Sequence, residues 1–121
     1  AQLDIGHVGV YRALAQEAGF MILDEPSSNL DYGNQIRIIR KIKELEQQSI
    51  GILMATHSPD HAFMLGSNAI ILHQGKVFSQ GSPDEVVTSP ALKKIYGVHV
   101  QIFDTPPNGT PSRKICAPKI E

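Results

Sequence analysis

Residues 20–31 read FMILDEPSSNLD, in which four apolar side chains run directly into two adjacent carboxylates. A short apolar run of this kind predicts a β-strand buried on both faces, as in a parallel sheet. Pro26 lacks the backbone N–H that a strand ladder uses, so we expect the strand to end near Glu25. Asp24 and Glu25 then lie at the carboxyl end of a strand, where open α/β sheets bind their ligands.

Two carboxylates at such a place can divide two tasks, since one can hold Mg²⁺ while the other polarises a water molecule. The alternative is a strand that merely ends in surface acids, and the Asp-Glu pair alone favours that alternative. The longer pattern does not. An apolar run followed by Asp-Glu-Pro and the turn Ser28-Asn29-Leu30-Asp31 resembles the Walker B motif and D-loop of ABC-transporter ATPases. Asn29 stands where that family most often has Ala.

A second apolar run, residues 50–57, reads IGILMATH and is followed by Ser-Pro-Asp. It resembles the switch loop, or H-loop, of the same family, in which a histidine at a strand end contacts the γ-phosphate of ATP. It also lies one predicted helix and one predicted strand after the first run, as in the family. His57 and His61 are four residues apart and could suggest a zinc pair. His57 precedes the predicted helix start, however, and the sequence offers no evident third ligand.

The rest of the chain predicts alternating helices and short strands. Residues 34–48 should form a helix capped by Asp31, because the apolar side chains recur at helical spacing at Ile36, Ile39, Ile42 and Leu45, with Ile38 beside them. Two further helices should begin at the repeated sequence Ser-Pro-Asp, at Ser58 and Ser82. Strands are expected at 69–73 and 76–80, joined by Gln74-Gly75 as a hairpin, and at 98–103.

These elements predict an α/β fold. It resembles a partial P-loop NTPase core of the ABC ATPase type, with a mainly parallel sheet, flanking helices and a C-terminal hairpin. We expect residues 1–103 to form the C-terminal half of an ABC ATPase domain. Residues 104–121 contain four prolines and no periodicity, and so predict a mostly disordered tail.

Composition sets limits on the function. A chain of 121 residues with a net charge of −1 suits one compact domain and gives no electrostatic reason to expect a nucleic-acid partner. The single cysteine, Cys116, cannot form an internal disulfide. The sequence has no apolar run of the roughly 18–20 residues that cross a bilayer, and its start does not read as a signal peptide. We therefore expect a cytoplasmic protein, which the resemblance places peripherally at the inner face of the cell membrane.

Two family motifs are missing from the sequence. No Gly-x-x-x-x-Gly-Lys-Ser/Thr pattern, the P-loop that cradles phosphates, occurs in it. A predicted helix at residues 8–18 resembles the helix that follows the ABC signature, but residues 1–7 lack the signature glycines. The family's catalytic domain is about twice this length. We therefore expect the isolated chain to bind ATP and Mg²⁺ weakly or not at all, and to be inactive alone.

The resemblance implies a role for each site residue. Asp24 would hold Mg²⁺ through water, Glu25 would polarise the attacking water, and His57 would contact the γ-phosphate. Ser28 and Asp31, in the D-loop, would lie near the nucleotide at the interface between ATPase subunits. The implied partners are a membrane permease subunit, a second ATPase subunit or a missing N-terminal half, and a second copy of the chain.

Residues 29–35 and the sequence Tyr-Gly-Val at 96–98 resemble the branch that serves importers of iron–siderophore, haem and cobalamin. Two other functions stay open. One is a non-catalytic module that binds a permease or a partner ATPase half. The other is an unrelated Mg²⁺-dependent phosphohydrolase using Asp24, Glu25 and His57, against which the turn Ser28–Asp31 argues.

Overall fold

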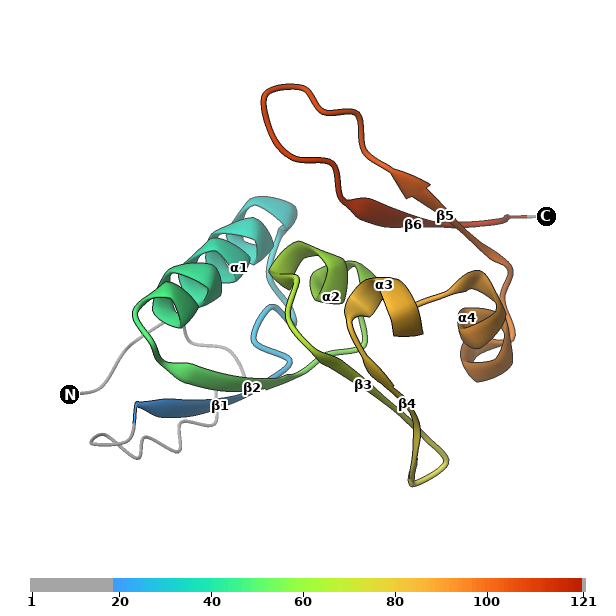
Figure 1. Ribbon diagram of the computed structural model, residues 1–121, viewed down its shortest axis with the longest axis horizontal. Coiled ribbons are helices and arrows are strands. Elements are labelled where there is room, and N and C mark those ends of the chain that lie inside the picture. The colour runs from blue at the N-terminus through green and yellow to red at the C-terminus, as the bar shows by residue number, and fades with distance from the viewer. Residues whose placement is uncertain (1–18, 121) are drawn as a thin grey trace. The chain divides into compact units, whose positions relative to one another are not determined.

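The computed structural model describes residues 19–120, shown as coloured ribbon in Figure 1. Contacts within the chain divide it into two compact units, one ending at His57 and the other beginning at Ser58, and each is described separately. The predicted helix at 8–18 and the altered signature sequence at 1–7 lie outside the described residues.

The first unit is a strand, a helix and a second strand. Strand β1 (Phe20–Asp24) leads through a turn into helix α1 (Tyr32–Gln47), and the chain returns in strand β2 (Gly51–Ala55). The two strands pair in parallel, with Phe20 opposite Gly51 and Asp24 opposite Ala55. Figure 1 shows α1 crossing over this strand pair. The predicted parallel pairing of the two apolar runs is therefore confirmed.

Helix α1 begins where its cap is placed. Asp31 is in an extended conformation and its Oδ1 accepts a hydrogen bond of 2.8 Å from the backbone N–H of Asn34. The helix buries one face, formed by Ile38, Ile39, Ile42 and Leu45. That face matches the predicted apolar stripe, although Ile36 is only half-buried. The helix begins at Tyr32, two residues before the predicted start, because the Asp31 cap sets its first turn.

The strand pair is buried on one face only. Met21 and Leu23 are fully buried, whereas Phe20 is 40% exposed and Leu53 is 54% exposed. Successive side chains of a strand point to opposite faces, so Phe20 and Leu53 share the less covered side. The prediction that the first strand is buried on both faces is therefore wrong in the described part of the chain. Among residues 19–57, helix α1 packs on one side of the β1–β2 pair, and the side chains of Phe20 and Leu53 lie on the other side.

The second unit contains the remaining elements. Their order is α2 (Pro59–Leu65), β3 (Ala69–His73), β4 (Lys76–Gly81), α3 (Pro83–Val86), α4 (Ser89–Tyr96), β5 (Val100–Asp104) and β6 (Lys114–Pro118). Strands β3 and β4 pair antiparallel around Gln74 and Gly75, both with positive φ, which is the backbone of a type I′ hairpin turn. The predicted hairpin is confirmed.

The core of the second unit is a cluster of Phe63, Val86, Val87 and Leu92, which we call the unit-2 core. Half-buried side chains pack against it from α2, from β3 and from the β5–β6 pair, namely Ala62, Ala69, Ile71, Val100, Ile102 and Cys116. The last strands of the chain thus contribute to this core. In the described part of the chain, no helix is long and apolar enough to cross a membrane.

Residues 114–118 contradict the prediction of a mostly disordered tail. They form β6, which pairs antiparallel with β5, with Val100 opposite Pro118 and Asp104 opposite Lys114. The prolines do not prevent this strand. Three of them lie in the connection at 105–113, and the fourth, Pro118, is the last residue of β6. Between them, Ile115, Cys116 and Ala117 supply strand-forming residues that are half-buried.

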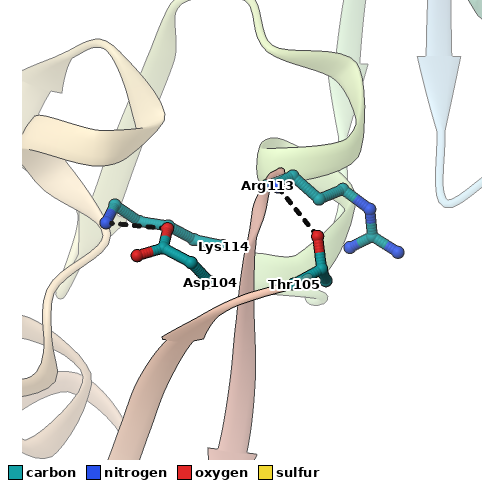
Figure 2. Close-up of polar contacts among 4 residues, drawn as sticks. All are labelled: Asp104, Thr105, Arg113 and Lys114. Atoms are coloured by element: carbon teal, nitrogen blue, oxygen red, sulfur yellow. Dashed lines mark hydrogen bonds and ion pairs between the residues drawn. The ribbon is translucent and has the colours of Figure 1, made fainter. Parts of the chain in front are cut away.

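The connection is closed at its base by three polar contacts, two of them drawn in Figure 2. The N–H of Thr105 donates to the carbonyl of Arg113 at 2.8 Å, and the N–H of Arg113 donates to Thr105 Oγ1 at 3.0 Å. Lys114 Nζ lies 3.5 Å from Asp104 Oδ1 across the strand pair. These contacts fix the register at which the chain returns.

Candidate functional site

The carboxylates of Asp24 and Glu25 lie where β1 ends and a turn begins. The ladder of β1 and β2 continues one residue past Asp24, because the N–H of Glu25 donates to the carbonyl of Ala55 at 2.9 Å. Pro26 then follows, fully buried, and the strand stops. Asp24 and Glu25 are thus held at the carboxyl end of the strand, as the sequence predicts.

Glu25 has a left-handed backbone, with φ of +47°. This conformation costs a residue with a Cβ on the order of 1–2 kcal/mol, so the surrounding turn must hold it. Its N–H is bound to Ala55, and its carbonyl accepts from the N–H of Ser28 at 3.0 Å. Backbone bonds on both sides of the residue therefore fix the direction in which the carboxylate leaves the chain.

Glu25 meets His57 at the end of the neighbouring strand. Glu25 Oε1 lies 3.5 Å from His57 Nε2, and the side chains are 30% and 92% exposed respectively. The two residues come together because parallel neighbours end at the same edge of a sheet, and His57 follows β2 by two residues. A part-buried carboxylate beside an exposed imidazole can exchange protons with a bound substrate or with water.

Asp24 provides the remaining acid at this edge, and its side chain is exposed. In the described part of the chain no three His, Cys, Asp or Glu residues gather closely enough to hold a metal ion by themselves. Mg²⁺ does not require such a cage, because it is commonly bound by one or two carboxylates together with water and substrate phosphates. A single exposed carboxylate oxygen donor such as Asp24 fits that mode of binding.

The turn from Ser27 to Asp31 connects the acids to α1. Ser28 is exposed, Asn29 has φ of +65°, and the N–H of Leu30 donates to the carbonyl of Ser27 at 3.3 Å. The structure gives Asp31 the predicted capping role on α1. Asn at position 29 suits its conformation, because Asn adopts the left-handed region more readily than Ala.

Sequence reasoning missed one residue that supports this turn. Gln35 Nε2 donates to the carbonyl of Leu30 at 2.9 Å and ties the turn to the first turn of α1. A glutamine on a helix carries no spacing signal for such a contact, so the sequence alone provides no reason to select it.

Comparison with known proteins shows the family to which the chain belongs. No family model matches the chain. An uncharacterized ABC transporter ATP-binding protein of Haemophilus influenzae is 46% identical over 87 residues, which are 72% of this chain and 33% of the relative. The ferric enterobactin transport ATP-binding protein FepC of Escherichia coli is 39% identical over 99 residues, which are 81% of this chain and 36% of the relative. The chain belongs to the ABC-transporter ATP-binding subunits.

This ABC-transporter ATP-binding chain spans about a third of the length of the curated relatives it matches. A solved chain from a metal-chelate type ABC transporter in an inward-facing conformation shares its fold, with a TM-score of 0.77 at 20% identity. That match covers 89% of this chain and 43% of the solved one. Further relatives are named for hemin import, vitamin B12 import, siderophore transport and lipopolysaccharide export.

Proposed function

We propose that this chain is part of the ATP-binding subunit of an ABC importer and carries half of its hydrolytic centre. The observation that carries the proposal is the 3.5 Å approach of Glu25 Oε1 to His57 Nε2 at the ends of adjacent parallel strands. Kinship to ABC ATP-binding subunits makes an unrelated phosphohydrolase the weaker explanation of the same residues.

In this proposal Glu25 accepts a proton from the water that attacks the γ-phosphate. Its fixed backbone and part-buried carboxylate support that role, because a general base must be held within hydrogen-bond reach of its water. His57 contacts the γ-phosphate, where an exposed imidazole can donate a hydrogen bond as charge develops. Asp24 holds Mg²⁺ through water, and the bound ion supplies positive charge against the phosphates.

Ser28 and Asp31 are proposed to lie near the nucleotide at the interface between two ATPase subunits. The exposure of both residues supports this, since each can be approached by a partner. Asp31 also caps α1, so the position of the turn is coupled to the helix.

The sequence supplies no phosphate cradle, and electrostatic stabilisation by such a cradle usually accounts for much of the rate enhancement in phosphoryl transfer. We therefore propose that the 121-residue chain alone binds ATP and Mg²⁺ weakly or not at all and does not hydrolyse ATP. In the whole subunit it would work with a second ATPase subunit and a membrane permease, at the cytoplasmic face of the membrane.

Iron–siderophore, haem or cobalamin is proposed as the cargo. The relatives named for ferric enterobactin, hemin, vitamin B12 and siderophores support this class. One relative is named for lipopolysaccharide export, so lipopolysaccharide is the alternative cargo that an experiment must exclude.

Grafting the chain into a relative tests the proposal. The 99 residues that align with the E. coli ferric enterobactin protein would replace their counterparts there, and growth would be measured with ferric enterobactin as the sole iron source. The proposal expects the graft to grow. A control graft with Glu44→Gln, which changes an exposed acid on α1, should also grow, whereas a graft with Glu25→Gln should not. A folded graft that hydrolyses ATP without restoring growth would contradict the importer assignment.

A further inference from the structure

Helices α2 and α3 begin with the same tripeptide, Ser-Pro-Asp, at residues 58–60 and 82–84. In both, the serine is the N-cap, the proline is in the first turn and the aspartate follows it. An acid in the first turn is favourable beside the positive end of the helix dipole. The sequence therefore predicts the same surface role for Asp60 and Asp84, and the structure separates them.

At α3 the cap is local. Ser82 Oγ accepts from the N–H of Glu85 at 3.3 Å, and Glu85 Oε1 accepts from the N–H of Ser82 at 3.2 Å, which completes a capping box. Hydrogen bonding to the Ser82 side chain, and then to the Ser82 backbone N–H, lowers the pKa of the Glu85 carboxyl below its ordinary value. Asp84 stays exposed on the surface.

At α2 the Ser58 side chain makes no capping hydrogen bond. The Asp60 carboxylate is directed to a different partner: its Oδ1 accepts a 2.8 Å hydrogen bond from the backbone N–H of Cys116, which lies 56 residues further along the chain. Cys116 is in the middle of β6, opposite Ile102 of β5. Asp60 thus satisfies a backbone donor of β6 that does not take part in the β5 ladder.

Asp60 contacts the side chain of Cys116 as well as its backbone. Burial raises the pKa of the Cys116 thiol to about 11, and the charge of Asp60 and a hydrogen bond from the thiol to Asp60 add to the effect. A carboxylate that accepts from both groups of one residue fixes that residue more firmly than either bond alone.

The strand pair from Val100 to Pro118, which we call the strap, covers the unit-2 core. Val100, Ile102 and Cys116 pack against that core from the strap. The contacts of Thr105 with Arg113 and of Asp104 with Lys114 join the two strands to each other and not to the rest of the unit (Figure 2). An isolated two-stranded hairpin is marginally stable at best in water, so we expect the β5–β6 pairing to weaken once the attachment of the strap to α2 is lost.

We propose that Asp60 is the latch of the strap: its carboxylate holds the β5–β6 pair closed over the unit-2 core, and its loss lets the pair open while the rest of the unit stays folded. Opening uncovers the core and the Cys116 thiol together. Local openings of this kind have smaller free energies than global unfolding and are a basis for regulation. The inference rests on the second unit alone and stands whether or not the proposed ATPase role is correct.

The test combines two measurements on the 121-residue chain without denaturant. Alkylation of Cys116 by iodoacetamide reports thiol access, and amide hydrogen exchange reports protection of the strap. In Asp60→Ala we expect alkylation to speed up about tenfold or more, because the reagent reaches an opened thiol more easily and a lower pKa raises the thiolate fraction. The strap amides at 100–104 and 114–117 should lose protection while the amide of Phe63 keeps its protection. The matched control is Asp84→Ala, with the same tripeptide and helix position, and should match the unchanged chain in both measurements.

Faster alkylation with unchanged exchange would mean that Asp60 acts on the thiol by charge alone, and would overturn the latch. So would equal effects of Asp60→Ala and Asp84→Ala. If Asp60→Ala does not fold, exchange in the unchanged chain at low denaturant decides. If the strap amides exchange before the Phe63 amide, the latch is supported. If the strap amides and the Phe63 amide exchange together in one step, the latch is overturned.

Discussion

Glu25 and His57 are joined across the ends of two parallel strands, with Glu25 Oε1 3.5 Å from His57 Nε2. A pair with one side chain 92% exposed contributes little to folding stability, because solvent screens it. The left-handed backbone of Glu25 is a further local cost. The arrangement therefore contributes little to the stability of the fold.

Glu25→Gln should leave the stability of the isolated chain within about 1 kcal/mol of the original, because the exposed pair with His57 contributes little. Mg²⁺ should bind the unchanged chain with about millimolar affinity or weaker, since one or two carboxylates without phosphates make a poor octahedral site. Thermal melts of Glu25→Gln and of the control Glu44→Gln measure the change in stability. Calorimetric titration of the unchanged chain with MgCl₂ measures the Mg²⁺ affinity. Micromolar Mg²⁺ affinity, or a large loss of stability confined to Glu25→Gln, would show a preformed metal site in this chain.

Asp31→Ala should lower the free energy of unfolding by about 1 kcal/mol, because it removes the side-chain cap of α1. Asp31→Asn, which keeps an acceptor, should retain most of the stability. Urea unfolding followed by circular dichroism compares the three proteins. Equal midpoints for Ala and the original would mean that the 2.8 Å bond to Asn34 does not stabilise the helix.

Stability should fall in alkaline solution because of Cys116. Its pKa is raised from 9.0 to about 11 in the folded chain, so the folded state holds the thiol proton more tightly than the unfolded state. The contribution is complete below pH 9.0 and is lost as the pH rises towards about 11. Melting temperatures across that range should drop more steeply for the original than for Cys116→Ala. Parallel curves for the two proteins would contradict the shift.

The exposed side of the β1–β2 pair should promote association. Leu53 is 54% exposed there and Phe20 is 40% exposed, on a sheet face of the kind that natural proteins normally cover. Leu53→Thr should reduce both light scattering at micromolar concentration and the binding of a hydrophobic dye. Leu72→Thr, at a site 69% exposed in the second unit, separates this face from general surface hydrophobicity. A strictly monomeric chain that binds no dye would refute the expectation.

The features that the sequence predicted are those with local signals. The Asp31 cap, the α1 stripe and the Gln74-Gly75 turn each depend on neighbours within one or two helical turns or a two-residue loop. The meeting of Glu25 and His57 was also predictable, because parallel strands share an edge and each residue follows an apolar run.

The features that were missed depend on distant parts of the chain. Strand β6 was expected to be disordered because its flanking prolines dominate the composition, while its pairing partner β5 lies before the intervening loop. The bond between Asp60 and Cys116 spans 56 residues, and the identical tripeptide at Asp84 shows that local sequence cannot reveal it. Two-sided burial of β1 was expected from an apolar run, and such a run does not indicate which other elements are present to cover the strand.

ATP hydrolysis by the grafted E. coli subunit tests the central claim most directly, with the isolated 121-residue chain measured beside it. The isolated chain should release phosphate from Mg-ATP no faster than a blank. In the graft, Glu25→Gln should lower kcat about 10²–10⁴-fold and His57→Ala about 10²–10³-fold, as expected for loss of a general base and of a charge-stabilising donor. The controls Glu44→Gln and His99→Ala, both at exposed positions, should leave kcat within about twofold of the graft, as is usual for surface substitutions. A Glu25→Gln graft that keeps the kcat of its Glu44→Gln control would contradict the account.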